Sequence, residues 1–148
     1  MGQSLSQVTV HIIFSTKARQ PLIAPSFRQH LHTYLAGLCT RFECVPFAVG
    51  GVSDHVHVLV GLHKTMSVST FVEKIKSTSS GWIKRTHVPD FAWQNGYGAF
   101  SVSESMKTKV IRYITNQDEH HKTVTFQEEL RAFLEQHQVA YDEQYLWN

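Results

Sequence analysis

The stretch DHVHVLV, residues 54–60, carries more information than any other part of the chain. Its β-branched and apolar residues predict a buried β-strand. Because successive side chains of a strand point to opposite faces of the sheet, His55 and His57 should share one face and the valines the other. Two imidazoles that converge outside a core are typical of a metal site. The alternative, which is the commoner case for an isolated His-x-His, is a pair of ordinary sheet histidines.

The composition is that of a globular protein. The chain has 148 residues, 42% hydrophobic and 18% charged, so we expect a single domain over residues 1–148 with a substantial core. The formal net charge of +2 does not by itself indicate a nucleic-acid partner. No apolar run approaches the ~20 residues that span a bilayer, and no signal-peptide core is present. Cys39 and Cys44 form no disulfide framework, so we expect a reduced, buried pair in a cytosolic protein.

The order of predicted elements indicates an α+β protein with a ferredoxin-like, or RRM-like, fold. The elements are, in chain order, strand 8–14, helix 25–42, strand 45–49, strand 55–60, a helix that Ser67 caps and Pro89 ends, and strand 91–102. This β-α-β-β-α-β order is typical of a four-stranded antiparallel sheet with two helices on one face. We expect the other face to stay open, with His55 and His57 pointing out of it.

Two further helices are predicted at about 106–120 and 126–137, before an aromatic tail at 141–147 that should pack on the body or on a partner subunit. Tyr113 and Gln117 are four residues apart, so they share one helix face. Two imidazoles and one amide oxygen can ligate a divalent cation and leave positions open, as a catalytic metal requires. A tyrosine hydroxyl beside that metal could attack phosphorus. By itself such a pair is more often a packed Tyr beside a solvated Gln, but the histidine pair favours catalysis.

The chain resembles, nearly from end to end, the single-tyrosine (Y1) transposases of the IS200/IS605 group, members of the HUH superfamily of single-strand DNA nucleases. The most specific part of the resemblance combines the His-hydrophobe-His triplet at 55–57 with the Tyr-x-x-x-Gln motif at 113–117. The other matching stretches are FSTK at 14–17, KSTSS at 76–80, WQNGYGAFSV at 93–102, QEEL at 127–130 and YLW at 145–147.

The resemblance implies that His55, His57 and Gln117 hold Mg²⁺ or Mn²⁺ and that Tyr113 is the nucleophile. It implies that the tyrosine attacks single-stranded DNA at hairpin-marked element ends, which gives a 5′-phosphotyrosine and a free 3′-hydroxyl. Another 3′-hydroxyl then rejoins the strands without ATP. The implied assembly is a homodimer whose active sites are shared between subunits, in the cytoplasm of a bacterium or archaeon, on the nucleoid. Recognition in this family rests partly on DNA pairing with DNA, so a small net charge is compatible with it.

Other residues are candidates for supporting roles. Asp54 is either a turn residue or an acceptor for the N–H of a ligating histidine, and His120 or His121 could be a supplementary ligand or support. Tyr97 could stack on a base, with cross-strand packing as the alternative. Cations that could contact phosphates, although each alone is more often a surface charge, are Lys17, Arg19, Lys74, Lys76, Lys84 and Arg85. No role is assigned to the remaining histidines, His11, His30, His32, His63, His87 and His137.

Two alternatives stay open. An RRM-like RNA-binding module shares the element order, and GYGAF at 96–100 is faintly similar to its glycine-aromatic run. That run would lie in the wrong strand, and such a module has no use for the histidine pair or for Tyr113 and Gln117. The second alternative keeps the chemistry but changes the task, to a relaxase, a replication initiator or a domesticated nuclease that acts on repeated hairpins. The small size of the chain favours a transposase.

Overall fold

The computed structural model, which describes residues 2–148, contains a four-stranded antiparallel sheet with the strand order β2-β3-β1-β4. The strands are β1 (Val8–Ser15), β2 (Val45–Gly51), β3 (His55–Leu62) and β4 (Gly98–Ser101). β1 and β3 pair along their whole length, from Val8 opposite Leu62 to Ser15 opposite His55. β3 therefore lies inside the sheet, between β2 and β1, and its side chains are fixed on both faces.

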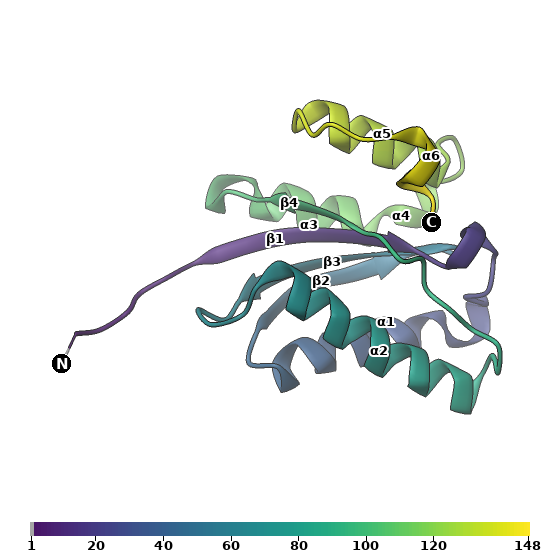
Figure 1. Cartoon of the computed structure of the whole chain (residues 1–148), viewed down its shortest axis with the longest axis horizontal. Helices are drawn as coiled ribbons and strands as arrows, with labels where there is room; N and C mark the ends of the chain where they lie inside the picture. Colours follow the sequence, from purple (N-terminus) through teal and green to yellow (C-terminus); the bar gives the residue numbers. More distant parts are fainter. Residues whose placement is uncertain (1) are drawn as a thin grey trace.

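Two helices, α1 (Pro25–Arg41) and α2 (Val68–Thr86), cover one face of the sheet (Figure 1). Pro25 stands in the first turn of α1, where its missing N–H leaves no hydrogen bond unmade. The Ser67 side chain accepts a hydrogen bond from the Thr70 N–H and caps α2. The apolar core between these helices and the sheet includes Ile12, Phe14, Leu31, Leu35, Val56, Val58, Val60, Phe71 and Ile75.

The C-terminal third of the chain covers the opposite face (Figure 1). After a short 3-10 turn, η2 (Glu104–Met106), come four helices: α3 (Lys107–Thr115), α4 (Gln117–His120), α5 (Phe126–Gln136) and α6 (Glu143–Leu146). A smaller apolar cluster holds this layer on the sheet and comprises Ile13, Phe100, Phe126, Leu130 and Leu134. A capping box formed by Thr125 and Glu128 fixes the start of α5.

The fold class is confirmed, but the prediction of an open second face was wrong. His55 and His57 both have 0% exposure, because the C-terminal helices lie over them. The predicted helix at 106–120 is two helices. Asn116 leaves the helical conformation, with φ −103° and ψ 25°, so α3 ends at Thr115 and α4 begins at Gln117.

β4 is also much shorter than the predicted strand at 91–102. Before Gly98 the backbone pairs with the sheet through one isolated bridge, between Thr16 and Trp93. The reason is Lys76 of α2, whose Nζ donates to the carbonyl oxygens of Gln94 (2.9 Å), Asn95 (3.4 Å) and Gly96 (2.6 Å). Those carbonyl oxygens accept hydrogen bonds from the ammonium group and form no hydrogen bond to a neighbouring strand. Lys76 is therefore held by backbone carbonyls and is not the free surface charge that was the commoner expectation for such a cation.

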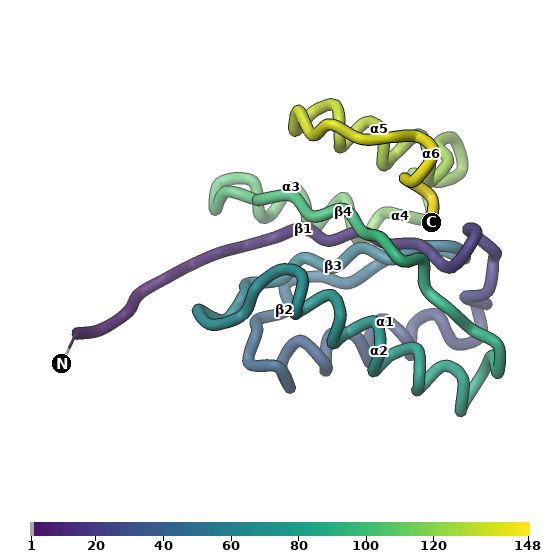
Figure 2. Tube along the Cα trace, viewed as in Figure 1, coloured from purple at the N-terminus to yellow at the C-terminus, as the bar shows by residue number. Residues whose placement is uncertain are grey.

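The aromatic tail packs back on the body, which is one of the two predicted outcomes. Leu146 and Trp147 contact the smaller apolar cluster, and Arg131 of α5 forms an ion pair with Glu143. The Gly96 N–H donates to the Asn148 carbonyl oxygen at 3.0 Å, so the C-terminus lies beside the loop that leads to β4 (Figure 2).

Cys39 and Cys44 are buried and unbridged, as predicted. Within residues 2–148, no helix combines the length and the apolar character needed to cross a bilayer.

Candidate active site

β3 carries the two predicted histidines on the face that α3, α4 and α5 cover. Because side chains alternate along the strand, Val56 and Val58 enter the apolar core while His55 and His57 point away from it. β1 adds His11 to the same face, two residues from Ile13, which pairs with His57. The Nε2 atom of His11 lies 2.8 Å from Nδ1 of His57, and this contact fixes the orientation of the His57 ring.

The break between α3 and α4 brings Gln117 to the histidines. Gln117 is the first residue of α4 and only 2% exposed, and its Oε1 lies 3.1 Å from Nε2 of His55. Tyr113, one turn earlier, is close to His57, with 5.7 Å between the two ring centroids. The structure thus brings the three predicted ligands and the predicted nucleophile together around one point.

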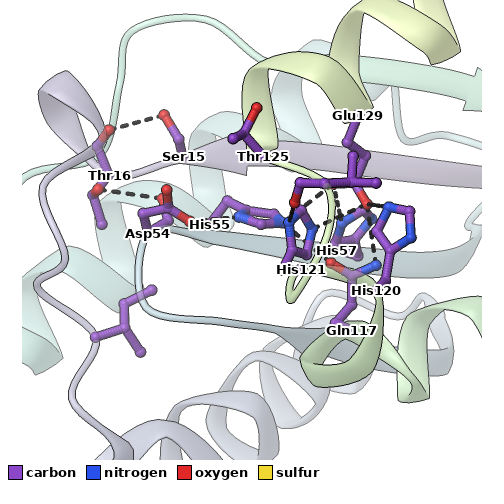
Figure 3. Close-up of polar contacts among 12 residues, drawn as sticks. Ser15, Thr16, Asp54, His55, His57, Gln117, His120, His121, Thr125 and Glu129 are labelled. Carbon is purple, nitrogen blue, oxygen red and sulfur yellow. Dashed lines mark hydrogen bonds and ion pairs between the residues drawn. The ribbon is translucent and has the colours of Figure 1, made fainter.

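Glu129 of α5 lies at the centre of this group, and the sequence analysis assigned it no role. It is 2% exposed, and its Oε1 is 2.9 Å from Nε2 of His57 and 3.2 Å from Nε2 of His55 (Figure 3). Its Oε2 accepts a hydrogen bond from the Tyr113 hydroxyl and lies 3.2 Å from Nε2 of His120. One carboxylate therefore contacts two candidate ligands and the candidate nucleophile.

One ligand atom from each of four residues gathers closely enough to hold a metal ion. These residues are His55, His57, His121 and Glu129, and the four atoms lie within 4.8 Å of one another. His121, predicted as a supporting residue, is therefore next to the predicted ligands. Asp54 also lies where a supporting carboxylate would, with its Oδ1 2.7 Å from Nδ1 of His55 (Figure 3).

A sequence signal for Glu129 was available. Phe126, Leu130 and Phe133 form the apolar stripe of α5, and Glu129 lies three residues after the first and four before the last. A glutamate inside such a stripe is directed into the protein, where carboxylates are rare unless they are paired. His11 gave no such signal, because its role depends on strand pairing that only the fold reveals.

Burial and close contacts change the acid–base properties of the group. Burial disfavours the charged form of His55, but hydrogen bonds to Asp54 and Glu129 outweigh this and raise its pKa to about 9. Burial lowers the pKa of His57 to about 4. Contacts from His121, His55 and His57 overcome the opposing effect of burial and hold the pKa of Glu129 far below its usual range. Burial, together with Glu129, raises the pKa of the Tyr113 hydroxyl, so this hydroxyl is protonated at neutral pH.

Most of the predicted DNA-contacting residues lie away from this site. Lys74, Lys84 and Arg85 belong to α2, which covers the opposite face of the sheet. Lys76 is engaged by backbone carbonyls, and Tyr97, 40% exposed, lines with it a cavity of about 440 Å³ between α2 and the loop before β4.

Lys17 and Arg19 lie in η1 (Lys17–Arg19), near the C-terminus, where the Arg19 guanidinium is 5.9 Å from the centre of the Trp147 ring. Of the two, Arg19 also reaches the candidate site, because it lines a cavity of about 400 Å³ with Asp54 and His121. Two cations that the sequence analysis missed do lie at the site. Lys109 and Arg112 line, with Tyr113 and His120, a cavity of about 690 Å³. On α3, Lys109 precedes Tyr113 by four residues and Arg112 precedes it by one. Lys109 therefore lies one turn before Tyr113 on the same face of the helix.

Comparisons with known proteins identify the fold and the family of the chain. A similar crystal structure is that of a “putative transposase from Deinococcus radiodurans R1”, with 24% identity over 79% of this chain and 96% of that one, and a TM-score of 0.60. Another is a REP-associated tyrosine transposase bound to a REP hairpin, with 14% identity over 84% of this chain and 76% of that one, and a TM-score of 0.61.

At these identities the two structures establish a shared fold. No curated protein sequence matches the chain. The family described as “Transposase IS200 like” matches residues 4–117, most of the chain, which includes the histidine pair, the tyrosine and the glutamine. The chain therefore belongs to the IS200-like transposase family.

Proposed function

We propose that this protein is a metal-dependent transposase that cleaves and rejoins single-stranded DNA through a covalent bond to Tyr113. The observation that carries the proposal is the convergence of the Tyr113 hydroxyl, the buried histidine pair and Gln117 on one buried point. A nucleophile next to a set of metal-ligating side chains is the arrangement that phosphodiester transesterification requires.

The side chains at this point fit a divalent cation, for which we propose Mg²⁺ or Mn²⁺. The Asp54 carboxylate contacts Nδ1 of His55. The other ring nitrogen of His55, Nε2, faces Oε1 of Gln117 and Oε1 of Glu129. A bare Nε2 lone pair directed at two oxygen acceptors is unfavourable, whereas a proton or a cation between them satisfies all three atoms. When bound, the cation would polarise the phosphate and offset the charge that develops on its oxygens.

The tyrosine needs a partner that accepts its proton. In this structure the Tyr113 hydroxyl donates to Glu129, but Nε2 of His120 lies only 3.1 Å from the same hydroxyl and burial lowers the pKa of His120. If a cation engages the Glu129 carboxylate, His120 is the acceptor that remains for this proton. In the proposed step the bond between Tyr113 Oη and phosphorus forms while the bond between phosphorus and the 3′ oxygen breaks. His120 takes the tyrosine proton, and the leaving 3′ oxygen takes a proton from water to become a free 3′-hydroxyl. Reversal by a second 3′-hydroxyl rejoins the strands.

We propose single-stranded DNA with hairpin ends as the substrate. Lys109 and Arg112 supply positive charge to the cavity that Tyr113 lines, and such charges position phosphates without reading sequence. The REP hairpin bound by one structurally similar protein supports a hairpin ligand. It also supports a second candidate function, a nuclease that acts on repeated hairpins and no longer moves an element.

The test uses labelled single-stranded DNA from the flanks of the gene, with Mg²⁺ or Mn²⁺. We expect a covalent protein–DNA adduct that survives denaturation, is lost in EDTA and is lost in Tyr113→Phe, which removes one oxygen atom. An adduct formed by Tyr113→Phe would show that another residue is the nucleophile, and an adduct formed in EDTA would exclude the metal.

We propose further that the protein acts as a homodimer that can share its active sites. The link between β4 and α3 is almost entirely exposed at residues 101–106, so little anchors α3 to its own strand. In the chain described here α3 lies over its own sheet. Mixing His57→Ala with Tyr113→Phe should restore partial cleavage if sites are shared, because one site of the mixed dimer is intact. No recovery after verified subunit exchange would show that each chain builds its own site.

A further inference from the structure

The segment beyond residue 117 supplies side chains to the candidate metal site. The family match ends at residue 117, whereas His121 follows α4 and Glu129 lies on α5. Both place an atom inside the group of four ligand atoms that lie within 4.8 Å of one another. The part of the chain beyond the family match thus contributes half of that group.

The three histidines of the group are oriented in the same way. In each, Nδ1 is occupied: by Asp54 Oδ1 at 2.7 Å for His55, by His11 Nε2 at 2.8 Å for His57, and by the Val124 carbonyl oxygen at 2.6 Å for His121. Each Nε2 atom therefore points to the interior of the group, and all three face Glu129 (Figure 3). Histidines that ligate metals usually have the second ring nitrogen held by a carboxylate or a carbonyl, as His55 and His121 do here, whereas the partner of His57 is the His11 imidazole.

The Glu129 carboxylate divides its two oxygens between the candidate ligands and the tyrosine. Oε1 lies 3.2 Å and 2.9 Å from Nε2 of His55 and His57, while Oε2 lies 3.2 Å from Nε2 of His121 and accepts from the Tyr113 hydroxyl. Three imidazole nitrogens facing one buried carboxylate form an N₃O donor set, which suits transition ions better than Mg²⁺.

We propose that Glu129 is a metal ligand, and that Glu129 and His121 complete with His55 and His57 a four-residue site that prefers a transition ion such as Mn²⁺ to Mg²⁺. This inference rests on the proposed function for the presence of a metal, but it assigns a ligand that neither the motif nor the family match contains. It makes the metal affinity of the chain depend on how α5 packs.

The test measures Mn²⁺ binding to the full chain by the loss of the electron paramagnetic resonance signal of free Mn²⁺, followed by competition with Mg²⁺. We expect Glu129→Gln to weaken Mn²⁺ binding by at least about tenfold. Glu135→Gln is the matched control, because it makes the same change at an exposed position of the same helix and should leave affinity unchanged. Tyr113→Phe should also bind Mn²⁺ as the wild type does. Equal Mn²⁺ affinity in Glu129→Gln and wild type would overturn the proposal, as would binding of Mg²⁺ as tight as that of Mn²⁺.

A measurement on the wild type covers the case in which Glu129→Gln does not fold. With ¹³C-labelled glutamate side chains, addition of diamagnetic Zn²⁺ should shift one carboxyl resonance, and no shift in any of them would overturn the assignment. The two proposals fail separately. If the wild type binds Mn²⁺ but forms no DNA adduct, the proposed function is refuted and the ligand role of Glu129 stands. If the wild type is active but Glu129→Gln binds Mn²⁺ normally, only the ligand role of Glu129 is refuted.

Discussion

The two faces of the sheet are built from the same strands but differ in chemistry. On β1, Ile12 and Phe14 enter the core under α1 and α2, whereas His11 and Ile13 point to the C-terminal helices. The α1–α2 face holds one large apolar cluster. The α3–α6 face holds a small apolar cluster beside a buried group of histidines, a glutamine and a glutamate. Strand alternation therefore separates side chains that stabilise the fold from side chains that can perform chemistry.

The difference shows what a buried polar group costs. Apolar burial contributes roughly 25 cal/mol for each Å² removed from water. Every apolar side chain buried on the α1–α2 face therefore stabilises the folded protein. Buried histidines and a carboxylate must be desolvated, and they recover that cost only through mutual contacts or a bound cation. We therefore expect the α1–α2 face to control unfolding and the α3–α6 face to control activity.

The strongest test of this separation is Phe14→Ala. Phe14 is fully buried and packs edge-on against Trp93, with 4.8 Å between ring centroids. The change should lower the free energy of unfolding by about 3–5 kcal/mol, measured in urea. Tyr113→Phe, on the other face, should lower it by less than about 1.5 kcal/mol while it abolishes the DNA adduct. Similar losses of stability in the two variants would contradict the comparison.

The predictability of the two faces also differs. The strands and both covering helices followed from local signals: β-branched runs, the Ser67 cap and the apolar spacing of Phe71, Val72 and Ile75. The length of β4 could not be predicted from local signals. It depends on a contact between Lys76 and backbone carbonyls that are about twenty residues further along the chain. The burial of the second face was missed for the same reason, since helix docking is a tertiary property.

At the candidate site, spacing paired His55 with His57 and Tyr113 with Gln117, although Tyr113 and Gln117 lie on two helices and not on one. The joint role of the four residues came from the family resemblance. Glu129 was missed although its position in the apolar stripe of α5 gave a local signal. The break at Asn116 was not predictable from the periodicity, which runs through it without a proline or glycine.

Lys76→Met tests whether a buried polar contact also stabilises the α1–α2 face. The substitution keeps the length of the side chain but removes the donor to the Gln94, Asn95 and Gly96 carbonyls. We expect a loss of about 2–3 kcal/mol in unfolding free energy, because charged hydrogen bonds are lost and the partly buried carbonyls of Gln94 and Gly96 are left unpaired. Lys84→Met, at an exposed position of the same helix, is the control and should change stability by less than about 0.5 kcal/mol. Equal effects would show that the ammonium contact contributes nothing.

Gly50→Ala tests how α3 is held on the sheet. A Cβ at Gly50 of β2 would stand 2.3 Å from the Ile114 carbonyl oxygen, so α3 would have to move. We expect a loss of about 1–2 kcal/mol in stability, and a drop of roughly a hundredfold in the rate of adduct formation, because Tyr113 is the neighbour of Ile114. Gly37→Ala, in α1 with open space around it, should preserve both. A wild-type rate in Gly50→Ala would mean that Tyr113 does not act over its own sheet.

The smallest predicted effect concerns His32, which lies on α1 yet lines a cavity of about 530 Å³ that Gln117 of the opposite layer also lines. Its Nε2 is buried without a hydrogen-bond partner among residues 2–148. Burial, with the charge of Arg28 adding to it, lowers the pKa of His32 from 6.5 to about 4. As pH falls from about 6.5 to 4, His32 takes up a proton in the unfolded chain but stays neutral in the folded chain. The free energy of unfolding therefore decreases over that pH window.

Because His32 is partly accessible, we expect its contribution to be on the order of 1 kcal/mol between pH 7 and pH 5. Urea unfolding in EDTA at both pH values, for wild type and His32→Gln, isolates it, since the other histidines titrate in both proteins. The wild type should lose more stability than His32→Gln, and adduct formation at pH 7 should be the same in both. Equal losses would show that His32 titrates normally. A loss of adduct in His32→Gln would show instead that α1 contributes to the α3–α6 face, and the two faces would no longer divide stability from chemistry.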